Sequence, residues 1–138
     1  MTNQNNEVEL TIPILPNMEI TATKTANAIA EFMNFDADKS AEVSMAIIEA
    51  CINSFEHSES PDGKVFITFK IKPDELIIEI RDNGKGFDPD SIKIPKIEDK
   101  FKEKRKRGWG MQLMKELMDD VKLTTNETGT LLVMSKKK

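Results

Sequence analysis

The chain has 138 residues, 38% of them apolar and 32% charged, which suits a single globular domain over residues 1–138. Its first six residues are polar and no run of about 18 apolar residues occurs, so we expect no signal peptide, no membrane span and a cytoplasmic location. Cys51 is the single cysteine, which excludes an internal disulfide and a cysteine-based metal site.

The formal net charge of −4 is distributed unevenly along the chain. Residues 93–107 hold eight basic side chains against three acidic ones, a net +5, so the rest of the chain carries −9. This basic segment suits a negatively charged ligand, and a solvated loop is the plainer interpretation. Nucleic acid is a third, against which the acidic remainder and the low aromatic content count.

The first elements predicted in chain order are a strand and two helices. Residues 7–15 alternate polar and apolar side chains, as a strand with one buried face does. Apolar residues then recur at helical spacing over residues 18–35, and again over residues 43–55 in a second helix. Asp36 or Asp38 is the predicted cap of this second helix.

The second half of the chain is predicted to hold two hairpins, separated by a long loop and a helix. The predicted elements are strands at 65–72 and 76–80, a loop over 82–107, a helix from 108 to before 121, and strands at 121–123 and 131–134. The loop is far longer than ordinary connections, and we interpret residues 86–107 as a lid over a ligand. Residues 136–138, all lysine, are expected to form a solvated tail.

The order of these elements predicts the fold class. Strands come in hairpins rather than in regular β-α-β alternation. This pattern favours an α+β fold, a two-layer α/β sandwich in which helices cover one face of a mixed, mostly antiparallel sheet.

The first candidate motif is a polar stripe on the second helix. Glu49, Asn53 and His57 are spaced by four residues, which places them about one turn apart on the same side of the helix. The same spacing is typical of a solvated helix face, so this motif by itself does not establish a site.

The second motif is the segment 82–87, Asp-Asn-Gly-Lys-Gly-Phe, directly after the apolar strand 76–80. Two glycines separated by one residue let the backbone turn sharply and approach a ligand closely. Asp82, at the end of a strand, can accept a hydrogen bond from an exocyclic amine. The segment therefore suits a purine, and a tight turn is the alternative.

The third motif is the segment 108–111, Gly-Trp-Gly-Met, which opens the third helix. Glycines at a helix N-terminus leave backbone N–H groups accessible, with the positive end of the helix dipole behind them, and phosphates bind well at such a place. A plain helix cap is the alternative. Trp109 lies between the two glycines, where its ring would crowd or cover the phosphates.

Together and in this order, the motifs resemble the histidine-kinase-like ATPase superfamily (Bergerat fold), which includes gyrase B, heat-shock protein 90 and the histidine-kinase catalytic domain. Within it, the chain is most similar to the bacterial anti-sigma-factor serine kinases. That likeness is carried by Glu49, Ala50, Asn53 and His57 on the second helix and by the stretch 110–121 after the loop. It covers nearly the whole chain.

The resemblance implies binding of ATP and Mg²⁺. By it, Asn53 holds Mg²⁺, Glu49 is the general base, Asp82 binds the adenine amine, and Thr130 supports the adenine end. Further residues expected to contact the nucleotide are His57, Gly84, Gly86, Phe87, Arg105, Gly108, Trp109, Gly110 and Met111.

The implied activity is that of a serine/threonine protein kinase. Its expected substrate is an anti-sigma-factor antagonist, and it is expected to bind a sigma factor as an anti-sigma factor, to form a homodimer, and to bind neither nucleic acid nor a membrane directly. The alternative is a module of the same fold in which ATP controls partner binding without phosphotransfer. A two-component histidine kinase would need an acceptor histidine on a separate helix pair, whereas the sole histidine, His57, lies on the nucleotide helix.

Overall fold

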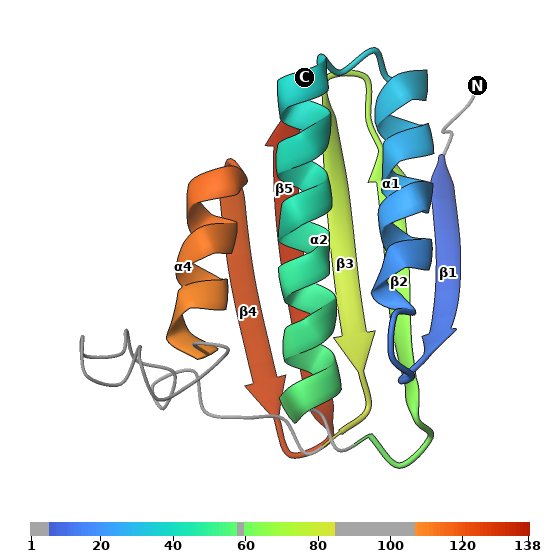
Figure 1. The fold of residues 1–138 in the computed structure, drawn as a ribbon, viewed down its shortest axis with the longest axis vertical. Coiled ribbons are helices and arrows are strands. Elements are labelled where there is room, and N and C mark those ends of the chain that lie inside the picture. The colour runs from blue at the N-terminus through green and yellow to red at the C-terminus, as the bar shows by residue number, and fades with distance from the viewer. Residues whose placement is uncertain (1–5, 58–59, 85–106) are drawn as a thin grey trace.

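The computed structural model of the chain describes residues 6–57, 60–84 and 107–138, and the structural statements below concern these residues. They form one sheet layer and one helix layer (Figure 1). In chain order the elements are β1 (Glu7–Pro13), α1 (Glu19–Phe32), α2 (Ala37–His57), β2 (Lys64–Ile71), β3 (Glu75–Asp82), α4 (Arg107–Leu117), β4 (Asp120–Asn126) and β5 (Gly129–Lys137).

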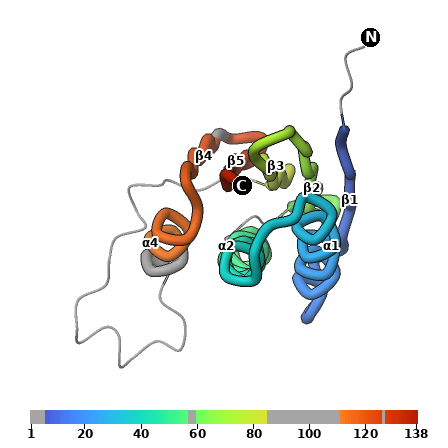
Figure 2. Tube along the Cα trace, turned by 90° about the horizontal axis from the view of Figure 1, so that it is seen from above, coloured from blue at the N-terminus to red at the C-terminus, as the bar shows by residue number. Residues whose placement is uncertain are grey.

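The sheet has the strand order β1-β2-β3-β5-β4, and all four pairs of neighbours in it are antiparallel. Helices α1, α2 and α4 lie side by side on one of its faces (Figure 2). The predicted two-layer α+β fold is therefore confirmed. Within the described part of the chain, no helix is long and apolar enough to cross a membrane.

The ends of the helices follow from local capping. Asp36 caps α2, because its Oδ1 accepts a hydrogen bond from the N–H of Lys39 at 2.8 Å. Helix α1 stops at Phe32, before the predicted end at residue 35, because Asn34 adopts a left-handed conformation with φ of 63°. The N–H groups of Asn34 and Phe35 then bond back to the carbonyls of Glu31 and Ala30, which is a Schellman ending.

The core lies between the sheet and the helices. Every second residue of the strands faces the core from the sheet, and small and branched residues of α1 and α2 face it from the helix layer. Its largest fully buried apolar side chains are Phe69, Ile12, Ile47, Ile67, Leu76, Ile78, Ile80, Met114, Met134, Val43 and Val65. The same alternation brings polar residues to this face where the strands end.

The last hairpin is longer than predicted, and the expected lysine tail is wrong in part. Strand β5 extends through Lys137, and Lys136 is only 7% exposed. The alternation of Thr130, Leu132 and Met134 continues to Lys136, so its side chain points into the protein. A run of three lysines concealed this period of two.

Candidate nucleotide site

Asp82 is the last residue of β3 and is 1% exposed. It continues the inward-facing row of Leu76, Ile78 and Ile80, so the row ends in a buried carboxylate under the helix layer. Oδ1 of this carboxylate accepts a hydrogen bond from the N–H of Gly84 at 3.0 Å, which folds the chain back at the predicted turn.

Burial raises the pKa of the Asp82 carboxyl above its usual range, because desolvation disfavours the charged form. The N–H of Gly84 and the hydroxyl of Ser54 counteract this rise by donating to the carboxylate. These two donors hold the buried carboxylate in a fixed orientation. A carboxylate held in this way is suited to accept a hydrogen bond from a planar N–H group such as an exocyclic amine.

Thr130 lies directly opposite Asp82 in the β3–β5 pairing and is also buried. Its Oγ1 lies 3.3 Å from Oγ1 of Thr125 on β4, so hydroxyl groups extend the polar end of the sheet beyond Asp82. The preceding Gly129 allows this close pairing. A Cβ at that position would collide with the carbonyl oxygen of Asp82 and lie 3.3 Å from Cα of Asn83.

Helix α2 brings Glu49 and Asn53 to the same region, since its second half runs toward the end of β3 (Figure 1). Asn53 is buried at 5% exposure and Glu49 is half-buried. His57, the third residue of the predicted stripe, is the last residue of α2. In the part of the chain that is described, no three His, Cys, Asp or Glu residues cluster to hold a metal ion. Asn53 offers an amide oxygen, a hard ligand of the kind that Mg²⁺ takes together with waters and phosphate oxygens.

Helix α4 begins at Arg107, so the predicted Gly108, Trp109 and Gly110 form its first turn. That first turn lies at the same end of the molecule as the ends of β3 and α2 (Figure 1). Met111 follows and packs partly buried against the core. The positive end of the helix dipole therefore lies at the same end of the molecule as the ends of β3 and α2.

Residues 12–136 match the family model of the histidine kinase-like ATPase domain. The chain belongs to this family. Among curated proteins, it is 31% identical over 135 residues to the serine-protein kinase RsbW of Oceanobacillus iheyensis, covering 94% of this chain and 85% of that relative. It is 29% identical to the serine-protein kinase RsbW of Bacillus subtilis over 145 residues, covering 99% and 88%.

Two solved structures share the fold of this histidine kinase-like ATPase domain. One contains the RsbU and RsbW domains of a Mycobacterium tuberculosis protein, with a TM-score of 0.71 and 14% identity over 95% of this chain and 32% of that one. The other is the histidine kinase domain of a blue-light activated kinase from Erythrobacter litoralis, with a TM-score of 0.51, 15% identity, and coverage of 99% and 69%.

The family and enzyme class predicted from the sequence, a serine/threonine protein kinase with an ATPase-like domain, are confirmed by these relatives. The individual site residues remain predictions. Those that lie outside the described residues are Gly86, Phe87 and Arg105, together with the expected lid over residues 86–107 up to the start of α4.

Two contacts of this kinase domain were not predicted. Ser54 donates to Oδ2 of Asp82 at 3.4 Å, and the signal for it was a polar residue within the apolar stripe of the second helix. Asn83 donates through Nδ2 to Oδ2 of Asp62 at 3.1 Å, which joins the turn before β2 to the turn after β3. No sequence pattern links Asp62 to Asn83, because their proximity follows from the pairing of β2 with β3.

Proposed function

We propose that this kinase transfers the γ-phosphoryl group of ATP to a serine or threonine of an anti-sigma-factor antagonist, and that it also binds a sigma factor as an anti-sigma factor. Curated relatives that carry the name serine-protein kinase RsbW along nearly the whole chain support the phosphotransfer. Both partners, and a cytoplasmic location, are inferred from the family resemblance.

The adenine end of the nucleotide is assigned to Asp82. Its carboxylate accepts a hydrogen bond from the exocyclic amine of adenine, and Thr130 on the neighbouring strand supports the ring. The burial of both residues supports this assignment, because a desolvated acceptor discriminates strongly against a base that lacks the matching donor. A guanine base presents a carbonyl where adenine carries its amine, so we expect ATP to be preferred over GTP.

The phosphate end is assigned to Asn53 and to the first turn of α4. The amide oxygen of Asn53 is a hard ligand, and together with phosphate oxygens and water it would hold Mg²⁺. When bound, Mg²⁺ neutralises phosphate charge and aligns the γ-phosphoryl group. The first N–H groups of α4 lack partners within their own helix and would donate to phosphate oxygens. Residues 93–107 supply the expected additional positive charge.

Glu49 is assigned as the general base. It lies one helical turn before Asn53, about 6 Å along the axis of α2, so a metal-bound phosphate and the carboxylate can face each other. The oxygen of the acceptor hydroxyl attacks the γ-phosphorus while the hydroxyl proton moves to Glu49. The bond between the γ-phosphorus and the bridging oxygen breaks, and ADP leaves with that oxygen. Glu49 is half-buried, so part of the residue remains accessible from solvent.

One observation carries this proposal: β3, which ends in the buried Asp82, and α2, which holds the buried Asn53 in its last turns, end at the same end of the molecule as the first turn of α4. The test is to incubate the protein with radiolabelled ATP, Mg²⁺ and each antagonist-like protein of its host. We expect label on a serine or threonine of one antagonist. Tight binding of ATP and antagonist without any transfer of label would instead favour the non-catalytic module.

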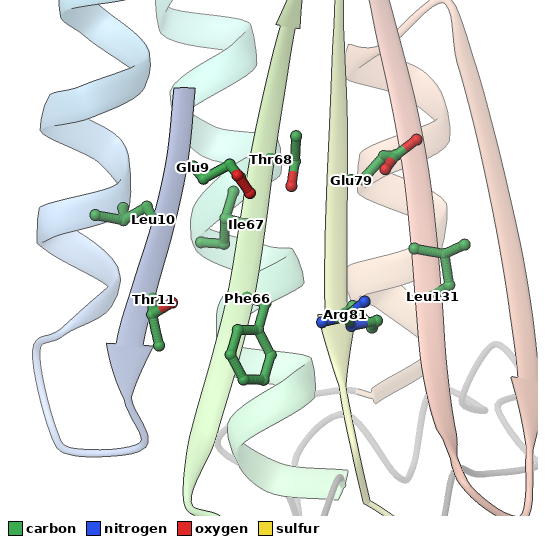
Figure 3. A pocket seen from close by; sticks show the side chains of 9 residues that line it. All are labelled: Glu9, Leu10, Thr11, Phe66, Ile67, Thr68, Glu79, Arg81 and Leu131. Atoms are coloured by element: carbon green, nitrogen blue, oxygen red, sulfur yellow. The ribbon is translucent and has the colours of Figure 1, made fainter. Parts of the chain in front are cut away.

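We further propose that the kinase is a homodimer that uses the helix-free face of its sheet. Figure 3 shows this face, which contains a hollow of about 250 Å³. The hollow is lined by Glu9, Leu10, Thr11, Phe66, Ile67, Thr68, Glu79, Arg81 and Leu131. The guanidinium of Arg81 lies 5.0 Å from the ring centre of Phe66, so an apolar centre and a cation adjoin there.

The charges on this sheet face suit a second copy of the same chain. Acidic Glu9 lies toward the β1 edge, and Arg81 lies on the central strand β3. Lys70 and Glu79 already pair across β2 and β3 at 3.0 Å. In a two-fold dimer each patch meets its own copy, so a face that carries both signs around an apolar centre can be self-complementary.

A further inference from the structure

Lys136 is a charged residue buried between the sheet and the helices. Its side chain is 9% exposed and it occupies an inward position of β5, where the preceding inward residues are Leu132 and Met134. Lysine is almost never buried to this extent without a partner, because an unpaired ammonium group loses far more hydration energy than its carbon chain gains. The groups that Lys136 contacts therefore indicate the structural role of its buried ammonium group.

Both partners of Lys136 belong to the helix layer. Its ammonium group donates to the carbonyl oxygen of Leu117, the last residue of α4, and lies 3.1 Å from Oε1 of Glu42 on α2. The final carbonyl groups of a helix have no partner within the helix, and a cation is favoured there by the helix dipole. A single side chain of β5 thus caps α4 and joins it to α2.

Neighbouring backbone bonds fix the same end of α4 to β5. The N–H of Asp119 donates to the carbonyl of Ser135 at 2.9 Å, and the carboxylate of Asp119 accepts from the N–H of Lys137 at 2.6 Å. The body of α4 meets the core through Met114, and Met118 packs into the core directly after the helix. Methionine side chains adapt readily to small displacements, so this packing restrains the helix less than the polar contacts at its end.

We propose that Lys136 is a positioning residue for phosphoryl transfer, which holds α4 against α2 so that the first turn of α4 stays aligned with the phosphates. This inference rests on the proposed function, which assigns that turn to the phosphates. Helix α4 has 11 residues and is about 16 Å long, and Lys136 acts at the end opposite the site (Figure 1). A helix moves as a rigid unit, so a shift at Leu117 reaches Gly108.

The experiment compares binding of ATP with Mg²⁺ and binding of adenosine by calorimetry in the Lys136→Met variant. Methionine keeps most of the chain length and removes the charge. Affinity for ATP should fall about tenfold, while adenosine, which reaches only the Asp82 end, should bind as it does to the wild type. Relative to the wild type, the variant should also show a larger increase in the rate of hydrogen exchange in residues 107–117 than in α1.

Lys39→Met is the matched control. Lys39 also donates to a backbone carbonyl of β5, that of Lys137 at 3.1 Å, but it is half-buried and this bond does not involve α4. It should leave both ligands unaffected. Glu42→Gln should weaken ATP binding in the same direction but by less than Lys136→Met, because the side chain of Glu42 is 40% exposed and the bond from Lys136 to Leu117 remains.

An equal change for ATP and adenosine in Lys136→Met, or no change for either, would overturn the positioning role. If that variant does not fold, Lys136→Gln, which keeps a donor without the charge, is judged by the same comparison. A wild-type protein that binds neither ligand would contradict the proposed function itself. In that case, equal rates of hydrogen exchange in α4 of the variant and the wild type would independently reject the proposal that Lys136 anchors this helix.

Discussion

Ser54 on α2 donates its hydroxyl hydrogen to Oδ2 of Asp82, at the end of β3, across 3.4 Å. Both residues are buried, so this contact joins the helix layer to the sheet at the site. The contact also stabilises the ionised form of a carboxyl group whose pKa burial raises. One hydroxyl group thereby links the placement of α2 to the residue that we propose binds adenine.

Ser54→Ala should weaken ATP binding about threefold to tenfold at neutral pH, in line with the loss of one buried hydrogen bond. The proposed hydrogen bond to adenine uses the ionised Asp82 as its acceptor, so affinity should fall as the pH falls through the raised pKa. Loss of the hydroxyl raises that pKa further, and the decline should therefore begin at a higher pH in the variant. Calorimetric titrations from neutral to acidic pH measure this.

Ser44→Ala is the control for this comparison, because Ser44 is also on α2 but donates to Oδ1 of Asn27 at 2.5 Å, away from Asp82. It should keep the wild-type pH profile. A Ser54→Ala protein with an unshifted profile would remove Ser54 from the recognition of adenine.

Asp82→Asn should weaken ATP and ADP alike, by about tenfold or more, since both carry the adenine amine. It should also stabilise the free protein at neutral pH. The folded-state pKa of Asp82 is raised, so its ionisation lowers the free energy of unfolding above that pKa, and this cost vanishes as the pH falls below the pKa of the unfolded chain.

Thermal unfolding of the Asp82→Asn variant at neutral and acidic pH checks the stability effect. The melting temperature of the variant should exceed that of the wild type at neutral pH, and the difference should shrink in acid. An effect on ATP without one on ADP would move Asp82 to the phosphate end of the site.

Asn53→Ala should abolish most of the Mg²⁺ dependence of ATP binding. The amide oxygen is the expected protein ligand, so the variant should bind ATP with nearly the same affinity with and without Mg²⁺, whereas the wild type should bind more tightly with it. Calorimetry in both conditions measures the difference. Wild-type Mg²⁺ dependence in Asn53→Ala would make the metal assignment wrong.

The parts of the fold that could be predicted are those that depend on local periodicity. The alternation in β2 and β3 and the helical spacing in α2 predicted these elements, and the position of Asp82 followed from the end of an apolar strand. Contacts between distant segments could not be predicted in the same way. The donation from Ser54 to Asp82 requires the packing of α2 on the sheet, which no local pattern encodes.

The burial of Lys136 is a second feature that local sequence could not predict. Three consecutive lysines are usually solvated, and their composition conceals which of them faces inward. Only the register of β5 against β3, with Lys136 opposite Leu76, determines that this one is buried. Composition predicted the exposed Lys138 and failed for Lys136 because burial in a strand depends on position rather than on residue type.

Phe66→Glu should convert the proposed dimer into monomers. The substitution places a charge at the apolar centre of the helix-free sheet face, where two copies would meet, and like charges related by the two-fold axis would repel. Phe32→Glu is the control, because Phe32 is 75% exposed on α1, on the opposite layer. Sedimentation analysis should find monomers for the first variant and dimers for the second, and equal masses for both would reject this interface.

Glu49→Gln separates phosphotransfer from binding. Glutamine keeps the size of the side chain and cannot accept the proton of the acceptor hydroxyl, so the rate of transfer should fall by about 10²- to 10⁴-fold. Binding of ATP should survive, because the adenine is assigned to Asp82 and the metal to Asn53. Capture of the antagonist and the sigma factor should survive as well, since neither requires a proton acceptor.

Single-turnover transfer from radiolabelled ATP to the antagonist, with calorimetry of ATP on the same sample, measures rate and binding side by side. Glu56→Gln is the matched control, since Glu56 is an exposed glutamate on the same helix, nearly two turns further along. It should transfer phosphate at the wild-type rate. Transfer at that rate by Glu49→Gln would defeat the assignment of the base. A loss of ATP binding by Glu49→Gln would instead make Glu49 part of the nucleotide site, because removal of a proton acceptor alone leaves ground-state affinity unchanged.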